Sequence, residues 1–129
     1  MDPSSWDWSR PLFDHVHLRV RDLQASRAFY VPVLETLGIP VMIDTAESVQ
    51  FPNFALSADG PASTHVHVAF IAADRDAVHA FHAAALAAGG TDNGAPGVRP
   101  YGPPHMETFA AYALDPDGTN VEAVCRILR

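Results

Sequence analysis

The tripeptide His-Val-His occurs twice in this chain, at residues 15–17 and 65–67, and it holds four of the seven histidines. Because successive side chains of a β-strand point to opposite faces, the two histidines of each tripeptide share one face of a predicted strand. The apolar residues between them share the other face and can pack on a helix. Imidazole is the commonest neutral metal ligand and the usual acid–base group near neutral pH. We therefore expect chemistry at a surface that both strands line.

The sequence around the tripeptides is repeated as well. Residues 14–30 (DHVHLRVRDLQASRAFY) match residues 64–82 (THVHVAFIAADRDAVHAFH) once a two-residue insertion is allowed, with the tripeptides aligned. A second phrase, FALSADG at 54–60, returns as YALDPDG at 112–118. The chain thus reads as two copies of one unit of about sixty residues, too few copies for a solenoid. We expect the copies to share one sheet, with the two histidine strands close together.

Each copy is predicted to fold as β-α-β-β-β, which makes the chain one α+β domain with helices on the outer face of a curved mixed sheet. An arm covers 1–10, module 1 covers 11–60 and module 2 covers 61–129. In module 1 we expect a strand at 12–20, a helix at 23–37 and strands at 40–44, 47–51 and 53–57. In module 2 we expect a strand at 65–72, a helix at 75–88, a loop at 91–104 and strands at 108–114 and 119–127.

The ends of these elements carry local signals. Asp22 and Asp74 are the expected N-caps of the two helices, because a carboxylate accepts hydrogen bonds from the free N–H groups of a first turn. Pro32 falls inside the first helix and should kink it. The loop at 91–104 is rich in Gly and Pro, a composition that resists strand pairing. DPDG at 115–118 is a tight-turn sequence.

Composition excludes several functions. The net charge is −7 and the eight basic residues are scattered, which argues against a nucleic-acid partner. No apolar run is long enough to span a membrane, and the start of the chain has no signal pattern. The single cysteine, Cys125, is compatible with the cytoplasm, and the absence of lysine removes Schiff-base chemistry and a P-loop. The composition therefore argues against a nucleic-acid or a membrane partner.

The phrases at 14–30 and at 115–122 (DPDGTNVE) together resemble the vicinal oxygen chelate superfamily of glyoxalases, bleomycin-resistance proteins and extradiol dioxygenases. The resemblance covers about residues 12–127. It implies paired βαβββ modules that curl into a cup around a divalent metal. The implied ligands are His15 and His65, from the first strands of the two modules, and Glu122, from the last strand.

Glyoxalase I enzymes carry a fourth ligand on the last strand of module 1, but residues 53–57 (NFALS) offer no carboxylate or histidine. The remaining set of two histidines and one carboxylate favours Fe²⁺, with Zn²⁺, Ni²⁺ or Mn²⁺ as alternatives. Type I extradiol dioxygenases resemble this pattern and have an active-site tyrosine before the glutamate, which Tyr112 matches. His105 lies where such enzymes carry a further histidine and is a candidate substrate-binding residue.

The expected function is a metalloenzyme that binds a substrate through vicinal oxygens, with dioxygenase-type or lyase/isomerase-type chemistry. His17, His67 and Tyr112 are candidates for moving protons. Arg99 and Tyr101, on the predicted loop, are candidates for gripping the substrate away from the metal, and Arg99 suits a carboxylate. The alternative is a metal-free binding protein of the bleomycin-resistance type that sequesters a drug in its cup.

The arm carries Trp6 and Trp8, two large side chains outside both repeats. Exposed aromatic side chains of this kind often cover a neighbouring surface. We therefore expect a homodimer in which the arm contacts the partner chain, or an arm that closes over its own cup.

Overall fold

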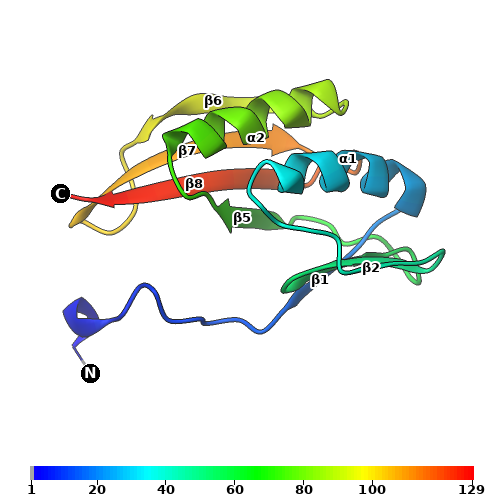
Figure 1. The fold of residues 1–129 in the computed structure, drawn as a ribbon, viewed down its shortest axis with the longest axis horizontal. Helices are drawn as coiled ribbons and strands as arrows, with labels where there is room; N and C mark the ends of the chain where they lie inside the picture. Colours follow the sequence, from blue (N-terminus) through cyan, green and yellow to red (C-terminus); the bar gives the residue numbers. More distant parts are fainter. Residues whose placement is uncertain (1) are drawn as a thin grey trace.

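The computed structural model describes residues 2–129 and has two modules, each with one helix on one face of a four-stranded sheet (Figure 1). Module 1 contains β1 (Val16–Arg19), α1 (Leu23–Glu35), β2 (Ile43–Asp44), β3 (Ser48–Phe51) and β4 (Phe54–Ser57). Module 2 contains β5 (His67–Ile71), α2 (Arg75–Ala87), β6 (Thr91–Arg99), β7 (Met106–Leu114) and β8 (Asn120–Leu128). A short 3-10 helix, η1 (Pro3–Ser5), lies in the arm. The predicted α+β class and the paired βαβββ modules are confirmed.

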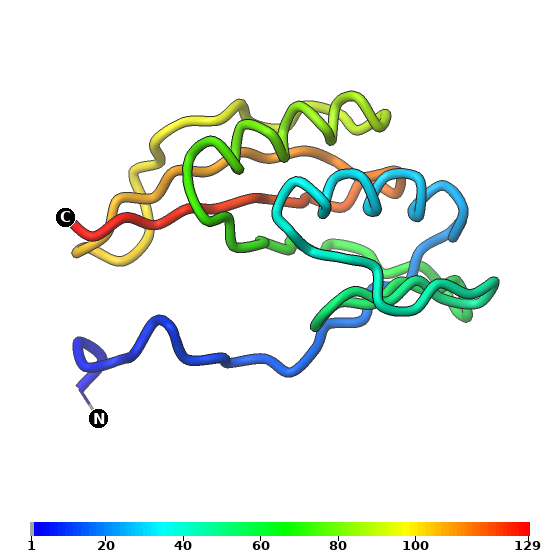
Figure 2. The backbone as a smooth tube through the Cα atoms, in the orientation of Figure 1, coloured from blue at the N-terminus to red at the C-terminus, as the bar shows by residue number. Residues whose placement is uncertain are grey.

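The two sheets have the same topology. Their strand orders are β1-β4-β3-β2 and β5-β8-β7-β6, so that in each module the first strand pairs in parallel with the last one. The other pairings are antiparallel. Contrary to our expectation of one shared sheet, the modules form separate sheets, and β1 and β5 are edge strands. The helices α1 and α2 contact each other on the same side of the molecule (Figures 1 and 2).

Both helices begin at their predicted caps. The Asp22 carboxylate accepts hydrogen bonds from the N–H groups of Gln24 and Ala25, and Asp74 accepts one from Ala77. Residues at helical spacing are buried beneath each helix, among them Phe29 and Leu34 in α1 and Phe81 in α2. Pro32 is exposed inside α1, which continues to Glu35 as one helix.

The core fills the space between the helices and the sheets. Along β1 and the residue that follows it, Leu18 and Val20 are buried, whereas the alternate residues His17 and Arg19 are exposed. This alternation follows the pleat of the strand and leaves the face of each sheet opposite its helix without a covering layer. We call this face of each sheet its open face. On these open faces, the exposed strand residues His17 and His67 can reach a ligand.

The segment 91–104 differs from the prediction of a loop. Residues 91–99 form the edge strand β6, which pairs with β7 and has register shifts between Asp92 and Gly94 and between Gly94 and Gly97. Pro96 falls in the second of these irregular stretches, on a strand whose outer side has no partner, so its missing N–H breaks no required ladder bond. The connecting loop is therefore confined to the residues after Arg99.

A buried hydrogen bond joins the two modules. The Tyr30 hydroxyl of α1 donates to Asp115 Oδ2, in the turn between β7 and β8, at 2.5 Å. The other carboxylate oxygen of Asp115 accepts from the N–H groups of Asp117 and Thr119. Burial raises the pKa of Asp115, and burial together with the neighbouring Asp115 charge raises the pKa of Tyr30 well above its ordinary value. The tyrosine is therefore held as a neutral donor.

We predict that Tyr30→Phe lowers the free energy of unfolding at pH 7 by about 1–3 kcal/mol, because Asp115 then loses a buried donor. Since the folded chain holds the Tyr30 proton more tightly than the unfolded chain, the stability that this group contributes is lost as the pH rises past about 10. In urea titrations the difference between wild type and variant should narrow above that pH. Equal stabilities at pH 7 would show that the bond has no role in joining the modules.

Candidate functional site

Two side chains that are distant in the sequence meet on the open face of module 2. His67 Nε2 lies 2.8 Å from Glu122 Oε1, and the Glu122 side chain is only 7% exposed whereas that of His67 is 50% exposed. The parallel pairing of β5 with β8 produces this contact, because it places Glu122 opposite Ala69, two residues from His67 on the same face. A buried carboxylate beside an accessible imidazole is the chemical centre of this face.

Tyr112 extends the centre to the next strand. It is the register partner of Glu122, and its ring centroid lies 5.9 Å from that of His67. The hydroxyls of Tyr112 and Tyr101 are hydrogen-bonded, and the Arg99 guanidinium lies over the Tyr112 ring, 5.4 Å from its centroid. Arg99 is also tied to the backbone, because its Nη2 donates to the Ala95 carbonyl at 2.5 Å.

The structure thus brings together five of the residues that the sequence singled out: His67, Glu122, Tyr112, Tyr101 and Arg99. Arg99 lies at the end of an edge strand, Tyr101 follows it, and Tyr112 lies on the neighbouring strand. Together they place two aromatic rings and one cation on the Tyr112 side of the His67–Glu122 pair. Such a set suits a small ligand with an acidic or oxygen-rich end.

A glycine makes the position of Tyr112 possible. A Cβ atom on Gly94 would lie 2.9 Å from Tyr112 Cδ2, and Gly94 has a φ of +151°. The Asp92 carboxylate accepts the Gly94 N–H at 2.9 Å and also contacts His82 Nε2 at 2.9 Å. These two bonds lower the pKa of Asp92, the Gly94 N–H contributing most. Sequence reasoning missed this support, although the Asp-x-Gly spacing of a bulged strand was a signal for it.

His65 does not join the group. Its backbone has a φ of +57°, a left-handed conformation, and it precedes the first residue of β5. Its ring contacts Thr64 Oγ1 at 3.3 Å, and the residue lines a hollow of about 400 Å³ beside the turn before β8. A strand-face histidine was expected at this position.

The helix N-caps give a repeat register that differs from the tripeptide alignment. His15 and His67 each lie seven residues before the N-cap of the following helix, Asp22 or Asp74, and therefore correspond to each other. The strand pairings then extend this register to the last strands, where Ala55 of module 1 corresponds to Glu122 of module 2. The two tripeptides are offset by two residues, so matching letters do not occupy matching positions.

The module 1 histidines lie on the other sheet. His15 Nδ1 contacts Asp14 Oδ2 at 2.7 Å, with the His15 side chain 69% exposed. His17 Nε2 contacts Ser57 Oγ at 2.6 Å. Within residues 2–129, no three His, Cys, Asp or Glu side chains are close enough to hold one metal ion. A single chain therefore does not gather His15 with His67 and Glu122.

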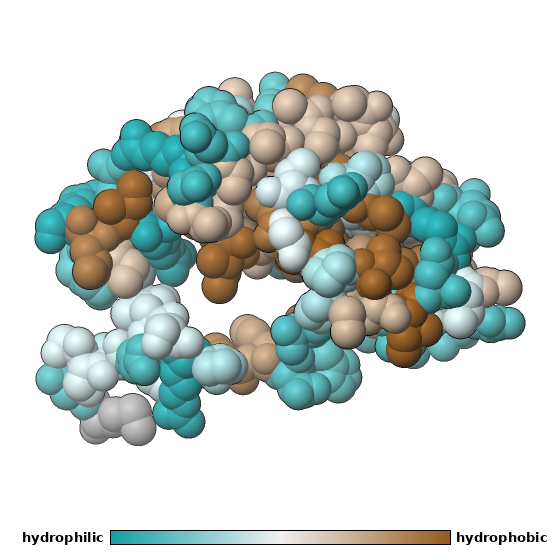
Figure 3. Space-filling view, in the orientation of Figure 1, coloured by the Kyte–Doolittle hydropathy of each residue, from teal (hydrophilic) through white to brown (hydrophobic). Residues whose placement is uncertain are grey.

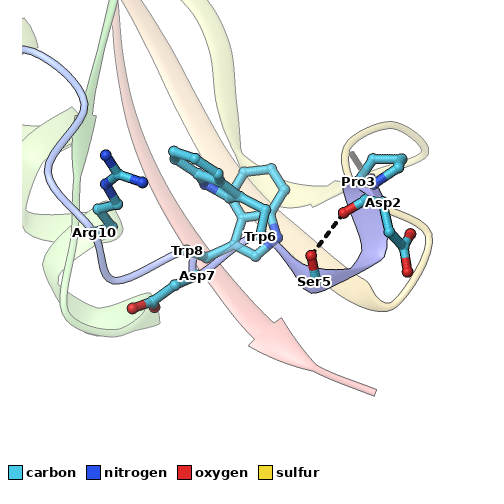
Figure 4. Close-up of a pocket in the computed structure, with 7 residues that line it drawn as sticks. All are labelled: Asp2, Pro3, Ser5, Trp6, Asp7, Trp8 and Arg10. Carbon is cyan, nitrogen blue, oxygen red and sulfur yellow. Dashed lines mark hydrogen bonds between the residues drawn. The ribbon is translucent and has the colours of Figure 1, made fainter.

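The arm contacts its own chain just before β7 and on β8. The Trp8 ring lies 6.3 Å from that of His105, and the Arg126 guanidinium lies 5.6 Å from the Trp8 ring centre. Arg10 covers Trp6 in the same way, at 5.3 Å. Figure 4 shows the two indole rings next to each other with Arg10 beside them, in a hollow of about 560 Å³ that only arm residues line. The space-filling view shows an opening between the arm and the rest of the molecule (Figure 3). His105, predicted to bind substrate, thus has the arm residue Trp8 as its aromatic neighbour.

The fold and the site define a class of paired βαβββ proteins. The family model described as "Glyoxalase/Bleomycin resistance protein/Dioxygenase superfamily" matches residues 12–123. The chain belongs to this superfamily, as the sequence phrases at 14–30 and 115–122 indicated. No helix among residues 2–129 has the length and apolarity needed to cross a membrane.

Solved structures of the same fold support the assignment. A glyoxalase/bleomycin resistance protein from Albidiferax ferrireducens T118 is 32% identical, with 88% of this chain and 98% of that chain covered and a TM-score of 0.77. A lactoylglutathione lyase from Agrobacterium tumefaciens is 18% identical, covers 90% and 94% of the two chains and has a TM-score of 0.59. The second likeness is one of fold alone. No curated protein matches this chain.

We predict that Gly94→Ala disturbs the site more than two matched glycine variants. Gly38 and Gly89 also have positive φ angles but have open space around a Cβ atom, so their change to Ala should cost about 1–2 kcal/mol of conformational strain. Gly94→Ala should cost about 1–3 kcal/mol more, because its methyl group meets the Tyr112 ring. Urea unfolding measures the costs, and tyrosine near-UV circular dichroism should change only for Gly94→Ala. Identical behaviour of all three variants would remove Gly94 from the site.

Proposed function

We propose that this protein is a metal-dependent enzyme that binds a small substrate through two vicinal oxygens. The proposed ligands are His67 and Glu122 of one copy and His15 of a second copy. His67 replaces the predicted His65 because it bonds Glu122 and lies, like His15, seven residues before a helix N-cap. The chemistry is of the dioxygenase type or of the lyase/isomerase type, both of which the superfamily includes.

The observation that carries the proposal is the burial of Glu122. Its side chain is 7% exposed, and His67 is its hydrogen-bond partner among residues 2–129. A buried carboxylate needs a positive charge or several donors, and one exposed imidazole provides little of either. A divalent ion fits this donor set, with Fe²⁺ favoured by a set of two histidines and one carboxylate and Zn²⁺, Ni²⁺ or Mn²⁺ possible. When bound, it supplies Lewis-acid polarisation of the substrate oxygens.

A second copy is the proposed source of the third ligand. His15 is exposed, and β1 and β5 are edge strands that each pair with another described strand on one side only. Beside them, Phe13 is 72% exposed and Ile71, on the same strand face as His67, is 84% exposed. Apolar side chains in such positions are expected to be covered. We therefore propose a homodimer in which the open face of module 1 meets the open face of module 2 of the other copy.

The remaining residues have proposed roles around the bound substrate. Tyr112 would donate a hydrogen bond to a substrate oxygen beside His67, which moves protons. Arg99 and Tyr101 would hold the far end of the substrate, with Arg99 facing a carboxylate. The support for these roles is the contact of all three side chains near the His67–Glu122 pair. His105 would affect substrate binding indirectly, through its contact with the arm residue Trp8.

The competing function is metal-free binding, in which the cup holds a small molecule without converting it. One observation favours it: residues 2–129 of a single chain contain no cluster of three metal ligands. The two functions differ in metal content, which is measured directly on protein purified without chelator.

We predict that wild-type protein purifies with about one divalent metal ion per chain and that His67→Ala and Glu122→Ala each abolish this binding. His65→Ala is the matched control, because it removes a histidine two residues away that bonds neither ligand. It should keep the metal. Elemental analysis after gel filtration measures the ratio. Loss of metal in His65→Ala, with metal retained in His67→Ala, would show that His65 is the ligand, as the tripeptide alignment predicts. Wild-type protein without metal would favour the metal-free binding function.

We further predict that two inactive variants complement each other if copies share the site. His15→Ala and Glu122→Ala each destroy every site in their own homodimers. Heterodimers of the two contain one intact site and one site that lacks both ligands, so random mixing should restore metal to about a quarter of the sites. Mixing after mild denaturation, followed by elemental analysis, measures this fraction. No restored binding, with dimers present by light scattering, would place all three ligands in one chain.

A further inference from the structure

A second group of hydrogen-bonded side chains lies on the open face of module 1, away from the His67–Glu122 pair. His17 Nε2 lies 2.6 Å from Ser57 Oγ, and Ser57 Oγ lies 2.6 Å from Asp59 Oδ1. Arg19 Nε donates to the same Asp59 oxygen at 3.1 Å. Ser57 is buried at 5% exposure, whereas His17 is exposed. The serine hydroxyl therefore links a surface imidazole to a carboxylate.

The proton positions follow from what each group can donate. The hydroxyl bond from Ser57 is the largest cause of a lowered pKa at Asp59, so this carboxylate is ionised at neutral pH and can only accept. Ser57 has one proton and gives it to Asp59. The short contact with His17 then requires that His17 Nε2–H donates to the Ser57 oxygen. In a neutral imidazole the other nitrogen, Nδ1, is left as an acceptor.

Comparison of the two modules shows that the fold does not require these hydrogen bonds. In the register that the helix N-caps and the strand pairings set together, Ala69 and Val124 of module 2 occupy the positions of His17 and Ser57. Both modules build the same strand pair, one with two apolar side chains and one with a histidine and a serine. The fold therefore does not need these polar groups, and their cost at a partly buried position calls for another explanation.

We propose that Ser57 and Asp59 are positioning residues that orient His17 so that its Nδ1 accepts a hydrogen bond from a hydroxyl of the ligand. The location rests on the proposed function, because His17 lies two residues from His15 on the same strand face, about 7 Å along the strand. A group held at His15 is then within reach of His17. The substrate class is a compound in which one of the two vicinal chelating oxygens is a hydroxyl, as in a 2-hydroxy carboxylate.

The hydrogen bonds are tested on the metal-free full chain by nitrogen-15 and proton NMR of the histidine rings, with His17→Asn to assign the signals. In wild type, His17 should carry its proton on Nε2, and this proton should be protected from solvent exchange. Ser57→Ala should remove the protection. Ser48→Ala is the matched control, because Ser48 is the register partner of Ser57 on β3 but does not contact His17. A proton on Nδ1 in wild type, or protection that survives in Ser57→Ala, would overturn the orientation.

The hydroxyl preference is tested by calorimetry on Zn²⁺-loaded protein with two probes, glycolate and methoxyacetate, which differ only in the methylated hydroxyl. Wild type should prefer glycolate by about fivefold more than His17→Phe does, the factor that one neutral hydrogen bond supplies. His17→Gln retains an acceptor and should recover part of this preference. An equal preference in wild type and His17→Phe would overturn the role of His17. Failure of Zn²⁺ to bind would instead overturn the proposed function, while the NMR result would still decide the orientation of His17.

Discussion

The parallel pairing of the first and last strands of each module is the constraint on which the rest of this structure depends. It places β1 beside β4 and β5 beside β8, although the paired strands are separated in the chain by a helix and two further strands. His67 and Glu122 meet only because of this pairing. The same pairing in module 1 brings His17 to Ser57. Each module therefore builds one small polar centre on its open face.

The helices make these centres possible by covering the other face. Each sheet packs its apolar side chains under a helix, so the alternating side chains on the open face are free to be polar. The two modules are then tied to each other by the helix contact and by the buried bond from Tyr30 to Asp115. These contacts fix the two modules relative to each other, and a site built from a few charged groups requires such a support.

The internal repeat explains why the two modules are alike, and the residues at matching positions explain why their open faces differ in chemistry. In one register, His15 and His67 correspond, whereas Ala55 corresponds to Glu122. Module 2 thus has a histidine and a carboxylate, and module 1 has a histidine without a carboxylate. A set of two histidines and one carboxylate needs one contribution from each module. Because one chain does not gather all three, the proposal of a shared site between two copies follows from the same asymmetry.

The sequence by itself determined the local structure of this protein and its superfamily. The N-caps Asp22 and Asp74, the turn before β8 and the alternation around His17 depend on neighbouring residues, so they can be predicted from short segments. The phrases that resemble the superfamily also belong to short segments. The Gly/Pro-rich segment 91–104 was predicted to be a loop, but an edge position allowed residues 91–99 to form a bulged strand.

Only the tertiary structure decided which histidine accompanies Glu122. The two His-Val-His tripeptides are identical as letters, and only the pairing of β5 with β8 brings His67 rather than His65 to Glu122. The gathering of Tyr112, Tyr101 and Arg99, and the bonds of Ser57 and Asp59, likewise join residues through side chains on neighbouring strands. Register is a property of two strands together, and a shift of one residue turns every side chain to the other face. No single segment of the sequence contains that information.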